Sequence, residues 1–102
     1  MNRFRDATLV RIYMTEHDRT LEPLLQHLHD VAEVKGVTVF RGIAGYGGSK
    51  QIHRAALVDL ALNLPLVVEF FDSPDRIETV LEQMADLIEP GHVVTWNVRA
   101  IY

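Results

Sequence analysis

The stretch from residue 64 to residue 91 constrains the fold most, because a strand pattern and a helix pattern follow one another there. Residues 64–72 are rich in valine and phenylalanine, and Pro65 lies at the start, where a strand tolerates a missing amide donor. Ser73, Pro74 and Asp75 are typical of a helix N-terminus. The apolar residues that follow recur at helical spacing: Ile77, Val80, Leu81, Met84, Leu87 and Ile88. We therefore predict a strand and then a helix that ends at residues 89–91.

The N-terminal part repeats this succession. Residues 8–14 alternate as a strand, with Val10, Ile12 and Met14 on one face. A polar turn follows, in which Asp18 or Thr20 can cap a helix. The apolar stripe of that helix comprises Leu21, Leu24, Leu25, Leu28, Val31 and Ala32. We expect Gly36 to end it. His27 and His29 are two apart, cannot chelate one metal from a helix, and are expected on its solvated face.

Two further strands, residues 37–41 and 93–102, complete the order strand, helix, strand, strand, helix, strand. That order predicts an α+β fold of the ferredoxin-like, split βαβ type (βαββαβ): an antiparallel four-stranded sheet with both helices on one face. The other face is left bare, with apolar residues such as Leu9, Tyr13 and Val39 and those of the last strand. Bare sheet of this kind tends to be an interface.

Composition narrows the classes of function. The 102 residues predict one domain, and 48% hydrophobic with 24% charged residues is globular composition. A net charge of −4 gives no footprint for nucleic acid, and the lack of cysteine excludes disulfides and thiol catalysis. The charged start leads directly into a strand, and no apolar run is long enough to cross a bilayer. We expect a soluble, cytoplasmic protein without membrane insertion.

The connection from residue 42 to residue 63 is much longer than the hairpin that this fold needs. Four glycines fall between Gly42 and Gly48, followed by the polar run Ser49-Lys50-Gln51 and by His53. Amides exposed in such a turn can bind an anion, to which Lys50 adds a charge. The alternative is a surface loop that needs glycine only for its turns. Residues 52–62 fit either a helix or a strand arm.

The combination of these motifs resembles a widespread uncharacterised family of PII-like proteins. The resemblance rests on the order of elements, on the run from Arg41 to Gly47 with Ser49 and His53, and on Leu64-Pro65 before Val67-Val68-Glu69. It extends from Leu9 to about Ile101. The loop of the signalling PII proteins, Gly-Phe-Gly-Arg-Gln-Lys, corresponds to residues 45–50, which retain glycines and the lysine. His92 stands where their second phosphate loop has a lysine.

The resemblance implies a homotrimer that binds adenine nucleotides in clefts between subunits. It also implies that the 42–63 loop reports the bound state to a protein target, such as a transporter, an enzyme or a regulator. We expect that no cofactor is required. The residues expected to bind a small anionic ligand are Arg41, Gly42, Gly45, Tyr46, Gly47, Gly48, Ser49, Lys50, His53, Gly91 and His92.

Each of these assignments has an alternative. Arg41 and His53 could stabilise the fold instead, for example in a salt bridge to Glu69, and Lys50 could be a solvated cation. A small enzyme with a pocket against the sheet would use acid–base groups from His53, Glu69, Asp72 and His92, but no nucleophile motif such as Gly-x-Ser-x-Gly occurs. Metal binding is a third reading, although the five histidines lack ligand spacing. We expect no catalytic residue and no metal site.

Overall fold

The computed structural model describes residues 3–46, 53–54 and 63–102. The predicted ligand residues Gly47, Gly48, Ser49 and Lys50 lie outside this range. So does most of the 52–62 segment, of which only the backbone of His53 and Arg54 is described. The alternatives for those positions therefore stay predictions.

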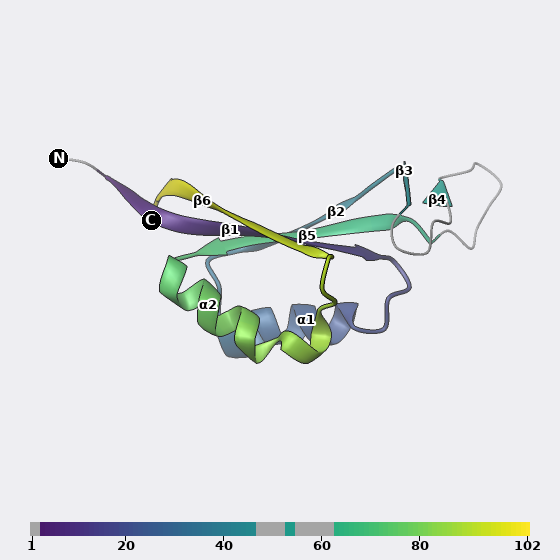
Figure 1. The fold of residues 1–102 in the computed structure, drawn as a ribbon, viewed down its shortest axis with the longest axis horizontal. Coiled ribbons are helices and arrows are strands. Elements are labelled where there is room, and N and C mark those ends of the chain that lie inside the picture. Colours follow the sequence, from purple (N-terminus) through teal and green to yellow (C-terminus); the bar gives the residue numbers. More distant parts are fainter. Residues whose placement is uncertain (1–2, 47–52, 55–62) are drawn as a thin grey trace.

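Four strands form an antiparallel sheet in the order β2-β5-β1-β6. They are β1 (Phe4–Thr15), β2 (Val37–Arg41), β5 (Pro65–Asp72) and β6 (Val93–Ile101). A two-stranded sheet pairs β3 (Ala44–Gly45) with β4 (His53–Arg54). The helices α1 (Leu21–His27) and α2 (Pro74–Gln83) lie under one face of the large sheet (Figure 1). The predicted ferredoxin-like α+β class is confirmed.

The core lies between this sheet and the helices. Val10 faces Phe70, Ile12 faces Val68 and Met14 faces Leu66 across the β1–β5 pair, and all six are buried. From the helical layer, the buried residues that complete the core are Leu24, Leu28, Ala32, Ile77, Val80 and Met84. Each fully buried large side chain of this type contributes about 1.5–3 kcal/mol of transfer free energy. The alternation read from the sequence is therefore what fixes the two layers.

The end of the first helix differs from the prediction. After α1 the chain continues as a π-helical segment, η1 (Leu28–Ala32). The helix ends with this segment, so Gly36 does not end it. Glu33 takes the left-handed conformation instead, with φ 50°. The Arg76 side chain on α2 donates hydrogen bonds to the carbonyl oxygens of Ala32 and Glu33. A residue far along the chain thus provides the hydrogen-bond donors that the carbonyl groups of a helix C-terminus require.

Three smaller predictions about the helices need correction. Asp18 bonds the amide and hydroxyl of Thr20, so it stabilises the turn, and neither side chain caps α1. Ser73 precedes α2 as predicted, but without a side-chain cap bond, and α2 ends at Gln83, followed by a short 3-10 turn η2 (Ala85–Leu87). His29 is exposed, whereas His27 is half-buried with its Nε2 atom inaccessible to solvent.

The second face of the sheet carries exposed apolar side chains. Because directly opposed residues of antiparallel strands share a face, the register assigns Leu9, Phe71 and Trp96 to it. Phe40 also belongs there through its pairing with Val67, while Val39 pairs with Val68 on the helix-covered face. The prediction that Val39 lies on the bare face is therefore wrong. We call the face that contains Phe40, Trp96 and Tyr13 the open face.

Candidate functional site

Glu16, which follows β1, contacts both stems of the 42–63 connection, the first at Arg41 and the second at Leu64. The Glu16 carboxylate pairs with the Arg41 guanidinium, and its second oxygen accepts the Leu64 amide at 3.2 Å. The Glu16 amide in turn donates to the Leu64 carbonyl at 2.9 Å. Arg41 is the last residue of β2, and Leu64 directly precedes β5. One side chain therefore contacts both stems of the 42–63 connection.

The glycines of the first stem are needed for close packing against Pro65. The Gly42 amide donates to the Pro65 carbonyl at 2.7 Å. A Cβ atom added at Gly42 would lie 2.8 Å from the Pro65 ring, and one added at Gly45 would lie 3.2 Å from it. Neither distance leaves normal room for a side chain, and a proline ring yields little. Two of the predicted ligand glycines thus have a structural role.

The turn before β6 presents the second group of predicted residues. Gly91 has φ +88°, a conformation that side-chain-bearing residues rarely adopt. A hydrogen bond from the His92 amide to the Glu89 carbonyl closes the turn. The His92 carbonyl accepts a hydrogen bond from the Tyr13 amide at 2.8 Å. The His92 ring points to the Glu89 carboxylate at 3.8 Å. Gly91 thus sets the turn that places His92 beside β1.

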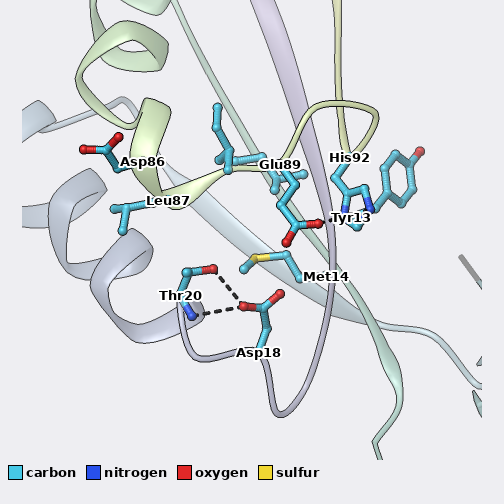
Figure 2. A pocket seen from close by; sticks show the side chains of 10 residues that line it. Tyr13, Met14, Asp18, Thr20, Asp86, Leu87, Glu89 and His92 are labelled. Carbon is cyan, nitrogen blue, oxygen red and sulfur yellow. Dashed lines mark hydrogen bonds and ion pairs between the residues drawn. The ribbon is translucent and has the colours of Figure 1, made fainter. Parts of the chain in front are cut away.

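A pocket of about 100 Å³ lies against this turn. Figure 2 shows Glu89 and His92 on one side of it and Asp18 and Thr20 on the other. Three carboxylates line it, those of Asp18, Asp86 and Glu89, against one imidazole. This balance disfavours an anion inside the pocket of a single chain, because each carboxylate would repel it.

The predicted residues form two groups at the same end of the sheet. Arg41 ends β2, with Gly42, Gly45 and Tyr46 after it, and the Gly91–His92 turn precedes β6. Because β2 and β6 are opposite edges of the four-stranded sheet, the groups are separated by about 14 Å, three strand spacings. One chain does not bring Arg41 and His92 together.

Sequence reasoning missed Glu16. The alternative partner that it considered for Arg41, Glu69, pairs instead with Arg11 on the open face at 2.8 Å. The sequence gives only a weak signal for Glu16. A contact between the ends of two strands can be predicted only when the strand order is known. The register supplies that order, because Arg41 pairs with Leu66, and Leu66 with Met14.

The Arg11–Glu69 pair makes the middle of the open face polar. Its carboxylate, together with Tyr13, raises the pKa of the Arg11 guanidinium above the ordinary value. Arg11 also lies over the Trp96 ring, 5.6 Å from its centroid. The pair is thus built into an otherwise apolar surface.

No helix among the described residues is long and apolar enough to cross a membrane. Within the same residues, no group of three or more His, Asp or Glu side chains is arranged to hold a metal ion.

The fold is that of PII-like proteins. CPII, a nitrogen regulatory PII-like protein from Thiomonas intermedia K12 solved with ADP and bicarbonate, superposes with a TM-score of 0.72 at 18% identity, covering 97% of this chain and 92% of CPII. The divalent ion tolerance protein CutA1 from Ehrlichia chaffeensis superposes with a TM-score of 0.59 at 9% identity, covering 94% and 82% of the two chains. These likenesses establish architecture.

The sequence establishes the family. Residues 7–100 match the DUF190 family model (Uncharacterized ACR, COG1993), and the chain belongs to this family. A UPF0166 protein from Aquifex aeolicus (strain VF5) is 40% identical over 99 residues, which cover 92% of each chain. The resemblance read from the motifs is therefore confirmed at the level of an uncharacterised PII-like family.

Proposed function

We propose that this protein is a PII-like regulator that assembles as a homotrimer and binds a small anionic ligand, an adenine nucleotide, in clefts between its subunits. The observation that carries the proposal is the position of the two groups of predicted residues. Arg41 and His92 lie at the same end of the sheet but on opposite edges. A ring of copies that places the β2 edge of one beside the β6 edge of the next would join them in one cleft.

The open face supports assembly. Phe40 is 47% exposed, Trp96 is 41% exposed, and Tyr13 and Val94 lie on the same face. Several large apolar side chains exposed on one face of a sheet favour an interaction surface. The central Arg11–Glu69 pair fits such an interface, because each charge already has its partner.

Charge and the fold comparison support the proposed ligand class. The first stem offers the Arg41 guanidinium and, from sequence alone, Lys50 and the loop amides, all of which favour an anion. The structure of CPII is described with ADP and bicarbonate, and CPII shares this fold. The uncharged part of a nucleotide would occupy the neighbour's pocket beside His92, where three carboxylates oppose phosphate.

The output of the regulator is proposed to pass through the 42–63 connection to a protein target. Its stems are held by Glu16, so a change at Arg41 reaches both of them. We propose the cytoplasm as its location, since a chain without cysteine suits a reducing compartment.

The test is a calorimetric titration of the purified protein with ADP, ATP, AMP and bicarbonate, alongside its mass by sedimentation. We expect saturable binding of at least one adenine nucleotide, weakened about tenfold or more in Arg41→Gln and Lys50→Ala, since each removes a charge-assisted contact. Asp30→Asn alters an exposed charged pair in the helical layer, away from the cleft and the open face, and serves as the control. A folded trimer that binds none of these ligands would refute the nucleotide part of the proposal.

A further inference from the structure

The carboxylate of Glu16 already pairs with Arg41, which is the cation proposed to bind the ligand. Its carboxylate is held from two sides, by the Arg41 guanidinium and by the Leu64 amide. The Glu16 side chain is 16% exposed, whereas the Arg41 side chain is 66% exposed. A dissolved anion can therefore approach Arg41 while Glu16 remains largely shielded from water.

We propose that Glu16 is a latch: it clamps the two stems of the connection together, and an anion that binds Arg41 opens the clamp by displacing the Glu16 carboxylate. This proposal rests on the proposed function, because it assumes that Arg41 meets the anionic ligand. It adds the mechanism by which binding at the first stem, at the end of β2, is transmitted to the second stem, before β5.

The coupling follows from how Glu16 is paired. When Arg41 leaves, the largely shielded Glu16 carboxylate keeps, among the described residues, the hydrogen bond that the Leu64 amide donates to it. A poorly compensated, partly buried charge is unfavourable, so the carboxylate turns toward water. The Leu64 amide then loses its side-chain acceptor as well. Loss of one contact thus favours loss of the other.

Other hydrogen bonds near the two stems are independent of this latch. The His17 amide donates to the Asn63 side chain at 3.1 Å, and the Gly42 amide donates to the Pro65 carbonyl at 2.7 Å. These bonds do not involve the Glu16 carboxylate. They keep the strands paired when the latch opens, so we expect a local change at the stems and no unfolding of the sheet.

The first experiment tests the latch without any ligand. Amide hydrogen exchange is measured by NMR in wild type, Glu16→Gln and Asp30→Asn, with Leu64 as the reporter and Val10 in β1 as the internal reference. Glu16→Gln keeps the side-chain shape and an acceptor oxygen but removes the charge. We expect exchange at Leu64 to rise about tenfold in Glu16→Gln and to stay within about twofold of wild type in Asp30→Asn. Equal protection of Leu64 in all three proteins would overturn the latch.

The second experiment adds ADP and, separately, inorganic pyrophosphate as probes. In wild type, a saturating anion should speed exchange at Leu64. In Glu16→Gln it should bind several-fold more tightly, because the internal competitor is weakened, and should leave Leu64 exchange unchanged. Binding that leaves wild-type Leu64 exchange unaltered would contradict displacement of Glu16. If neither probe binds any variant, the proposed nucleotide function fails and the displacement step falls with it, while the first experiment still decides the clamp.

Discussion

The Arg76 guanidinium neutralises the buried Asp72 carboxylate, with Nε 3.2 Å from Oδ2, while another of its nitrogens donates to the Ala32 carbonyl at the end of η1. Asp72 is 2% exposed and closes β5, and its other oxygen accepts the Ser73 amide at 2.7 Å. Arg76 therefore connects three elements: the end of β5, the start of α2 and the end of η1.

Replacement of Arg76 should lower the free energy of unfolding more than is usual for an exposed residue. In Arg76→Ala the Asp72 carboxylate stays buried without its cation, and the helix-end carbonyls lose their donor. We expect the free energy of unfolding to fall by about 2–4 kcal/mol, measured by urea denaturation. Arg99→Ala, which removes an arginine stacked over Phe4, is the matched control and should cost less than about 1 kcal/mol. Equal costs would contradict the bridging role of Arg76.

The glycines of the chain should differ in their tolerance of alanine. Gly42→Ala introduces a Cβ atom 2.8 Å from the Pro65 ring and should destabilise by about 1–3 kcal/mol, with a smaller loss for Gly45→Ala at 3.2 Å. Gly36 has open space around it, so Gly36→Ala should be neutral or stabilise by up to about 1 kcal/mol. Thermal denaturation of the three variants gives the order, and a harmless Gly42→Ala would show that the stem packs differently.

Of two adjacent residues of β2, substitution of one should disrupt assembly and substitution of the other should not. Phe40 lies on the open face, and Val39, 41% exposed, faces the other side. Phe40→Glu would place a charge in the proposed interface, so sedimentation velocity should show the oligomer dissociating to monomers. Val39→Glu should leave the mass unchanged. Dissociation in both variants, or in neither, would argue against the open face as the interface.

Asp30 provides a prediction on pH. A hydrogen bond from the adjacent His29 ring lowers the pKa of Asp30 below its ordinary value. Because the folded pKa is lowered, the contact adds stability above the ordinary aspartate pKa, near 3.9, and this stability is lost as the pH falls through the lowered value. The contribution is small because both side chains are exposed. In His29→Ala, NMR titration should show the Asp30 midpoint moving upward, and an unchanged midpoint would exclude this cause.

Much of the fold could be predicted because local patterns and global packing agree. The alternation in β1 and the stripes of the two helices identify the buried residues, and the element order leaves few topologies. The helix ends could not be predicted in the same way. Gly36 is a good local stop signal, yet the chain leaves the helix at Glu33, where Arg76 supplies donors from a distant part of the sequence.

The candidate site was predictable only in part. The Gly91 conformation and the crowding of Gly42 agree with glycine being required at both positions. Glycine patterns, however, do not distinguish close packing against Pro65 from room for a ligand. The pairing of Arg41 with Glu16, and the face on which Val39 lies, depend on strand register, which no local pattern encodes.

The most direct test of a cleft shared between subunits is ADP binding by a mixed oligomer. Arg41→Gln and His92→Ala, which are expected to bind weakly when separate, are unfolded together, refolded as a mixture and titrated calorimetrically. If each cleft takes Arg41 from one copy and His92 from its neighbour, about a quarter of the clefts regain both residues, and tight binding reappears at that stoichiometry. Tight binding that stays absent from the mixture, although wild type taken through the same procedure binds, would contradict the shared cleft.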